Sequence, residues 1–254
     1  MTLDGTNTYV LAEPGSGEAV VVDPGPDDPG HLRRVQAELA HHGQRAGLVL
    51  LTHGHPDHAA GAASFAERAG CAVRAVDPAH CTGTDGLAGG DRLSVAGLVV
   101  EVMDTPGHTA DSASLVLRDE PAMLTGDTVL GRGTTVVAHP DGRLGDYLTS
   151  LRRIESAAER MPQMRLLPGH GPAGAPLASV VALYRVHRGT RLAQVVGAVA
   201  AGASDADAVV ASVYAAVDRT LWPAARLSVL AQLEYLCQAG LLVSTPRGLS
   251  VPDG

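Results

Sequence analysis

The chain has 254 residues, 45% of them hydrophobic, with no Lys and a net charge of −8. No apolar run approaches the roughly 18 to 20 residues that cross a bilayer, and no export signal follows Met1, so we expect a cytoplasmic protein with no membrane partner. Residues 1–179 hold 13 Arg against 22 Asp plus Glu, and residues 180–254 hold 6 against 5, so the acidic body argues against non-specific binding of nucleic acid.

Short apolar runs alternate with helical patterns along the first 175 residues. Residues 31–43 are a predicted amphipathic helix, with Leu32, Val35 and Leu39 at helical spacing. Further helices are predicted at 59–70 and 144–161. Strands are predicted at 8–13, 18–25, 47–53, 71–76, 91–95, 98–107, 113–119, 122–127 and 164–171. This order predicts two sheets covered by helices, with the chemistry in loops at strand ends.

The loop after residues 47–52 gathers three histidines and an aspartate in six positions: His53, His55, Asp57 and His58. A buried cluster of histidines needs a partner for every ring nitrogen, and clustered cations repel one another. A divalent metal ion solves both problems, because neutral imidazole and carboxylate are good ligands. On a turn, His53 and His55 would take one ion, and Asp57 and His58 a second.

Two coordination shells need further ligands, and three candidates follow along the chain. His108 comes after a strand and a Pro-Gly turn, Asp127 ends the next strand but one, and His170 follows the last predicted strand. A glycine precedes each of them, which allows backbone and metal to approach closely where a Cβ atom would intrude. The sequence therefore predicts a dinuclear metal site at the strand ends.

In its motifs and their order the chain resembles the metallo-β-lactamase superfamily over residues 2–173. The resemblance implies an α+β fold, a four-layer αββα sandwich, with His53, His55 and His108 on the first ion, Asp57, His58 and His170 on the second, and Asp127 bridging them. Asp23 matches a position that usually lies just behind the metals. The expected cofactor is two Zn²⁺, and iron or manganese would suit the same ligands.

Within the superfamily the chain is similar to the lactamase-beta-like protein 2 family, through residues 1–10, 146–151, 166–172 and 184–191. That family carries a small C-terminal winged-helix-like α domain. Residues 176–202, 204–217 and 223–240 read as three helices, with Ser204 as the expected N-cap of the second, and residues 241–252 read as a hairpin. We therefore predict a catalytic domain over 1–175 and a winged-helix-like domain over 176–254. Family members usually have a further strand before the segment at residues 5–9.

The ion pair predicts a hydrolase in which a metal-bridging hydroxide is the nucleophile. Asp57 is expected to orient that hydroxide and, with Asp127, to be catalytic. The favoured substrate is single-stranded RNA, since animal members of the similar family cleave it. One alternative is an acyl-thioester hydrolase of the glyoxalase II or polyketide thioesterase type, and the other is a non-catalytic winged-helix binding protein with a structural metal.

Candidate substrate residues lie in two segments. His139 and Tyr147, between Asp127 and His170, are expected in a loop that lines the substrate site. Arg185, His187 and Arg188 are expected to bring the first C-terminal helix to the active site, where Arg185, Arg188 and Arg191 would offer a path for a phosphate backbone. A solvated helix face explains the spacing of these arginines equally well. The oligomeric state is open, with a homodimer as one alternative.

Overall fold

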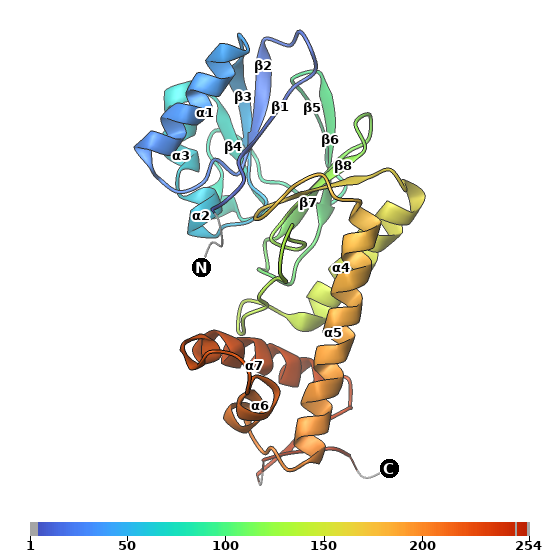
Figure 1. The fold of residues 1–254 in the computed structure, drawn as a ribbon. Helices are drawn as coiled ribbons and strands as arrows, with labels where there is room; N and C mark the ends of the chain where they lie inside the picture. Colours follow the sequence, from blue (N-terminus) through green and yellow to red (C-terminus); the bar gives the residue numbers. More distant parts are fainter. Residues whose placement is uncertain (1–4, 247, 253–254) are drawn as a thin grey trace.

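Two β-sheets pack face to face, with helices on both outer sides (Figure 1). The computed structural model describes residues 5–246 and 248–252. The four layers confirm the predicted αββα sandwich, and a smaller helical part follows at the C-terminal end. Among the described residues, no helix is long and apolar enough to span a bilayer.

The first sheet has four strands in the order β1-β2-β3-β4. Its strands are β1 (Tyr9–Leu11), β2 (Glu18–Val22), β3 (Arg45–Leu50) and β4 (Ala72–Arg74). A tight turn makes β1 and β2 antiparallel, whereas helical crossovers make β2, β3 and β4 parallel. Helices α1 (Pro29–His41) and α3 (Ala62–Ala69) cover the outer face. Leu32, Val35 and Leu39 of α1 are buried, as their spacing predicts.

The second sheet has five strands in the order β5-β6-β7-β8-β9. Its strands are β5 (Arg92–Val95), β6 (Leu98–Asp104), β7 (Ala113–Leu117), β8 (Ala122–Gly126) and β9 (Arg165–Pro168), and a 3₁₀ turn, η1 (Pro78–His80), follows β4. Strands β5 to β8 form an antiparallel meander, and β9 runs parallel to β8. All residues of β7 are buried, because apolar layers cover both of its faces.

Helix α4 (Leu144–Arg160) covers the outer face of this second sheet. Tyr147, expected in a substrate-lining loop, lies in the first turns of α4 and is fully buried. Its hydroxyl donates to the carbonyl oxygen of Thr128 at 2.7 Å. The expected contact between Tyr147 and substrate is therefore wrong, because the apolar face of α4 turns this ring into the core.

The C-terminal part has three helices and a small hairpin, as predicted. Its elements are α5 (Leu177–Ala200), α6 (Ala206–Val213), the 3₁₀ turn η2 (Arg219–Leu221), α7 (Trp222–Gln238), β10 (Val243–Thr245) and β11 (Gly248–Ser250). The N-cap of α6 is Asp205, whose carboxylate accepts from the amide of Ala208 at 2.8 Å. Ser204, the expected cap, lies one residue too early for that contact.

Helix α5 belongs to both parts of the molecule (Figure 1). Leu177, Val181 and Tyr184 in its first half pack into the core formed by α4 and the second sheet. Val195 and Val199 in its second half pack against α6 and α7. The predicted boundary at 175/176 falls just before α5, but this helix contributes to the cores on both sides.

Candidate metal centre

The histidine loop begins directly after β3, at the edge of the first sheet. His53, His55 and His108 bring three ring nitrogens together: His53 Nε2 and His108 Nε2 each lie 3.0 Å from His55 Nδ1. A tetrahedral zinc ion with bonds of about 2.0–2.1 Å separates its ligand atoms by about 3.3 Å. These three side chains are thus spaced to hold one metal ion.

A second group of three ligands lies beside the first. Pro56–Ala59 form the short helix α2, which presents Asp57 and His58 toward His170 at the end of β9. The Nε2 atoms of His58 and His170 are 3.3 Å apart, and Asp57 Oδ2 lies 3.2 Å from His170 Nε2 and 3.5 Å from His58 Nε2. The break between α2 and α3 falls at Gly61, where an added Cβ would lie 2.7 Å from the carbonyl oxygen of Pro26.

Asp127 lies between the two groups. Its Oδ2 is 3.2 Å from His170 Nε2 and 3.7 Å from His108 Nε2, so this carboxylate reaches ligands of both ions. Its Oδ1 is buried without a hydrogen-bond partner among the described residues, and it lies 3.4 Å from His58 Nε2. A buried carboxylate oxygen without a donor is costly. A metal ion would satisfy it, which agrees with the expected bridging position.

The ring nitrogens that face away from the centre show how three of these imidazoles are protonated. The Nδ1 atom of His58 donates to Asp23 Oδ2 at 2.9 Å, and those of His108 and His170 donate to the carbonyl oxygens of Val136 and Gly5, both at 2.8 Å. In a neutral ring, a proton on Nδ1 leaves a lone pair on Nε2. Facing lone pairs need a cation between them, so the donor set fits two metal ions.

Asp23 lies at its expected place behind the metals. Besides His58, its carboxylate accepts from the amide and hydroxyl of Thr52, at 2.8 and 2.7 Å. The Thr52 hydroxyl is also 3.1 Å from His53 Nδ1. One buried carboxylate thereby orients ligands of both ions. Asp23 has a φ of 49°, a left-handed conformation that Asp tolerates better than most residues.

The amino-terminal residues also hold the centre, a role not assigned from the residue types alone. The hydroxyl of Thr6 donates to Asp57 Oδ2 at 2.9 Å, and Gly5 supplies the carbonyl for His170. Asn7 fixes this strand end by donating to the carbonyl oxygens of Pro168 and Gly171. The segment at residues 5–9 resembles the family, but the sequence did not single out these residues as supports of the metal ligands. Backbone carbonyls and hydroxyls that hold a ligand follow no recognisable spacing pattern.

Two glycines next to ligands are required by close packing, as their positions predict. An added Cβ at Gly169 would lie 2.4 Å from Asp127 Oδ1 and 2.7 Å from His58 Cε1. At Gly126, where φ is 48°, it would lie 2.5 Å from the Thr52 hydroxyl. Any side chain at these turns would displace a metal ligand or the residue that supports one.

In the absence of a cation, the carboxylates favour protonated imidazoles at the second position. Burial lowers the pKa of His58, but Asp23 and Asp127 outweigh it and raise the pKa to about 10. Burial also opposes the shift at His170, where Asp127 and Asp57 raise the pKa to about 10. His53 behaves differently, because burial and then the neighbouring His58 and His108 lower its pKa. A metal ion at the second position must therefore displace protons.

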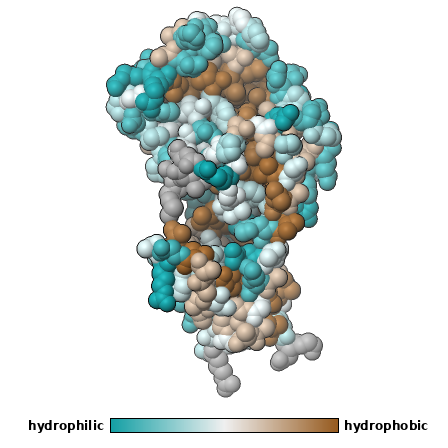
Figure 2. Space-filling view, in the orientation of Figure 1, coloured by the Kyte–Doolittle hydropathy of each residue, from teal (hydrophilic) through white to brown (hydrophobic). Residues whose placement is uncertain are grey.

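A cavity of about 520 Å³ opens above the ligands, between the catalytic part and the C-terminal helices. Figure 2 shows apolar residues gathered around the waist of the molecule where these parts meet. Beyond the ligands, the cavity is lined by Pro56, Leu130, Thr134, Thr135, Val136, Ala138, Asp141 and Ala224. Ala224 belongs to α7, so the C-terminal part completes the wall. Among the described residues, no Arg lines this cavity.

The expected substrate residues lie outside this lining. Arg185 is exposed and pairs with Glu155 of α4, away from the cavity. His187 is half-buried, and burial followed by Arg188 and Arg191 lowers its pKa. His139 follows the lining residue Ala138 without being part of the lining itself. These three side chains do not line the cavity, and their contact with substrate stays a prediction.

Arg188 is 6% exposed and does not line the cavity either, which corrects its expected contact with substrate. Its guanidinium lies 4.7 Å from the ring centre of Tyr147 and donates to the carbonyl of Thr135, a lining residue. Arg191 contacts the Tyr214 ring and the carbonyl of Val213 within the C-terminal part. The three arginines expected to contact a phosphate backbone are thus each engaged with partners inside the protein.

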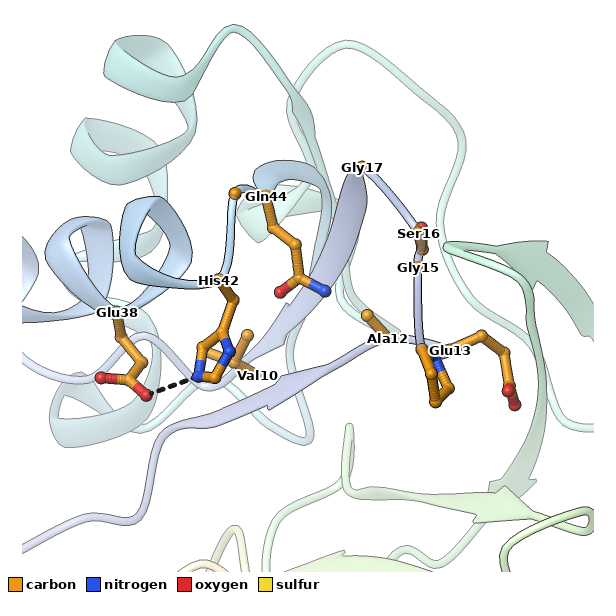
Figure 3. A pocket seen from close by; sticks show the side chains of 11 residues that line it. Val10, Ala12, Glu13, Gly15, Ser16, Gly17, Glu38, His42 and Gln44 are labelled. Atoms are coloured by element: carbon orange, nitrogen blue, oxygen red, sulfur yellow. Dashed lines mark hydrogen bonds and ion pairs between the residues drawn. The ribbon is translucent and has the colours of Figure 1, made fainter.

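A second groove, of about 480 Å³, lies between the β1–β2 turn and the end of α1 (Figure 3). Glu38 and His42, one helical turn apart at the end of α1, pair at 3.1 Å on one side of it. None of the described residues that line it is a metal ligand. The cavity above the metal centre is thus the candidate substrate site, because it alone of these two contains reactive groups.

Comparison with known proteins agrees with this architecture. Residues 1–170 match the family model of the metallo-beta-lactamase superfamily, and residues 206–248 match that of the beta-lactamase associated winged helix domain. A metallo-beta-lactamase family protein from Thermus thermophilus shares the fold, with a TM-score of 0.80 at 22% identity over 97% of this chain and 94% of that one.

Two curated relatives extend the comparison. A beta-lactamase-like protein 2 homolog from Caenorhabditis elegans is 32% identical over 77% of this chain and 65% of its own length. An atrochrysone carboxyl ACP thioesterase from Aspergillus fumigatus is 37% identical over 67% of this chain and 52% of its own length. The chain thus spans about half to two thirds of the length of these relatives.

Proposed function

Because the chain belongs to the metallo-beta-lactamase superfamily, we propose that it is a dinuclear metal-dependent hydrolase whose substrates are acyl thioesters. The carrying observation is the lining of the cavity. Above the ligands the walls are mostly apolar, with Thr134, Thr135 and Asp141 as the polar residues, and no Arg among the described residues lines them. Such a surface suits an acyl chain and offers no side-chain cation for a phosphate backbone.

Two ions in this centre would supply a water of lowered pKa and polarise the carbonyl oxygen of the substrate. His53, His55 and His108 would hold one ion, Asp57, His58 and His170 the other, and Asp127 would reach both. Zinc, iron and manganese all suit such ligands. Asp57 lines the cavity and is kept ionised, because hydrogen bonds from His170 and Thr6 overcome the effect of burial and lower its pKa.

The protein side chains would then position and protect the reaction. Asp57, anchored by Thr6, would orient the attacking water through its carboxylate. Leu130, Val136 and Ala224 would exclude bulk water around the acyl chain. The thiol leaves as the carbonyl carbon gains its new oxygen, so the products are a carboxylic acid and a free thiol.

The relatives support this proposal unequally. The printed name of the Aspergillus relative is that of a thioesterase acting on an acyl carrier protein. The expectation of single-stranded RNA cleavage stays a prediction, and the engaged arginines and a cavity lined by no described Arg weigh against it. Every predicted ligand belongs to a group that could hold a metal ion, and this donor set disfavours the non-catalytic alternative.

A side-by-side substrate screen tests the proposal. Metal-loaded protein and its Asp57→Ala variant are offered a series of acyl-coenzyme A thioesters and, separately, a single-stranded RNA. We expect free thiol to appear with wild-type protein and to fall at least about 100-fold with the variant. If the wild-type protein cleaves the RNA and turns over no thioester, and the Asp57→Ala variant does not cleave the RNA, the thioesterase proposal is wrong. The endonuclease prediction would then take its place.

A further inference from the structure

Helix α5, which belongs to both cores, reaches the segment that lies between Asp127 and the cavity. Tyr184 and Arg188 are one helical turn apart and point to the same side. The Tyr184 hydroxyl accepts from the amide of Leu130 at 2.8 Å, and the Arg188 guanidinium donates to the carbonyl of Thr135. Arg188 is 6% exposed, and its Nε has no hydrogen-bond partner among the described residues.

The residues around Thr135 connect this contact to the metal ligands. The Thr135 hydroxyl donates to the backbone carbonyl of Asp127 at 2.6 Å. The next carbonyl, that of Val136, accepts from His108 Nδ1 at 2.8 Å. Consecutive carbonyls are thus held by the arginine of α5 and by a ligand of the first metal position.

We propose that Arg188 is a positioning residue that ties the C-terminal helices to the metal position of His53, His55 and His108. By fixing the Thr135 carbonyl it sets the place of the Val136 carbonyl, and so the ring orientation of His108. Outer partners of this kind typically change metal affinity 10- to 100-fold. The inference concerns the metal centre alone and is independent of the acyl-thioester proposal.

The second metal position is held from elsewhere. Thr6 and the Gly5 carbonyl support Asp57 and His170 through hydrogen bonds in which α5 takes no part. Arg188 acts on the first position through the Val136 carbonyl and reaches the second only through Asp127. Its loss should therefore affect the first position more than the second, whereas a general loss of packing would affect both alike.

The test uses two backgrounds that each retain one complete group of three ligands. His170→Ala keeps the first group and His55→Ala keeps the second. In each background, metal affinity is measured by competition with a chromophoric chelator. The protein that retains Arg188 is compared with its Arg188→Met variant. We expect about 10- to 100-fold weaker binding in the His170→Ala background and a smaller change in the His55→Ala background, where Asp127 is the shared ligand. Arg188→Lys, which keeps a donor, should restore part of the loss.

Two matched variants separate positioning from folding. Arg185→Met removes an exposed arginine of the same helix and should leave both affinities unchanged. Thr6→Val should give the opposite pattern, weakening only the position kept in the His55→Ala background. Equal weakening of both positions by Arg188→Met would overturn the proposal. So would unchanged affinities in variants whose thermal unfolding shows an intact fold.

Discussion

Three of the metal-binding imidazoles are fixed by the partner of their other ring nitrogen. Asp23 holds Nδ1–H of His58, and the carbonyl oxygens of Gly5 and Val136 hold those of His170 and His108, which leaves Nε2 ready to bind. These partners are one carboxylate and two backbone carbonyls, so the ligand geometry depends on backbone placement as much as on the ligand residues.

Loss of the bridging carboxylate should abolish activity. Asp127 reaches ligands of both ions, so Asp127→Ala should lower turnover on the order of 100-fold or more and reduce bound metal. Turnover and metal content per chain are measured together. Asp146→Ala, at an exposed position paired with Arg143, is the matched control and should behave as wild type. Full turnover of Asp127→Ala with intact metal content would contradict the bridging role.

Metal uptake should release protons. His58 and His170 have pKa values raised to about 10 in the metal-free protein, so both carry protons at neutral pH. An ion binds only neutral imidazole, so affinity should rise with pH as far as about 10. Titration calorimetry in buffers of different ionisation enthalpy measures the protons released. The same heat in every buffer at pH 7 would show that these rings are neutral before binding.

At the scale of elements, strand ends and helix ends bring the ligands to one place. The loop after β3, the end of β8 and the end of β9 supply most of them. Strands β8 and β9 are parallel neighbours and expose the same ends, and the loop after β3 of the other sheet meets them there. The short α2 turns Asp57 and His58 toward the second ion. In the C-terminal part, the start of α6 is set by a capping side chain.

The cap of α6 gives a direct test of its observed boundary. Asp205→Ala removes the acceptor for the Ala208 amide and should lower the free energy of unfolding by about 1 kcal/mol. Ser204→Ala is the matched control and should cost little, since only its backbone carbonyl is used, by the amide of Leu249. Chemical denaturation of the three proteins measures the difference. A larger loss for Ser204→Ala would restore the predicted cap.

Across the whole molecule, the C-terminal helices close the cavity that the sandwich leaves open. Helix α5 links the two cores, and α7 contributes Ala224 to a wall otherwise built from the catalytic part. The small side chain at this position leaves room over the ligands. The C-terminal part therefore completes the wall of the candidate substrate site.

Enlarging that side chain should shorten the acyl chains that are accepted. Ala224→Phe would fill part of the cavity of about 520 Å³ without touching a ligand. We expect kcat/KM for long acyl thioesters to fall about 10-fold or more, with short ones little changed. Metal content serves as the control. An equal fall for all chain lengths would place Ala224 outside the path of the acyl chain.

The sequence alone predicted much of this protein, because the relevant signals are local. Apolar periodicity marked the strands and helices, and the spacing of His53, His55, Asp57 and His58 indicated two ions before any fold was known. The resemblance of the motifs then supplied the complete ligand set. All seven predicted ligands come together in the structure.

Only the tertiary structure decided the surroundings of the centre. Tyr147, Arg185 and Arg188 were expected at the substrate, yet one lies in the core, one pairs with Glu155, and one holds the Thr135 carbonyl. A helical residue's neighbours depend on which face packs against which element, and sequence spacing does not state this. The cavity wall and the carbonyl partners of the imidazoles likewise arise from segments that meet only after folding.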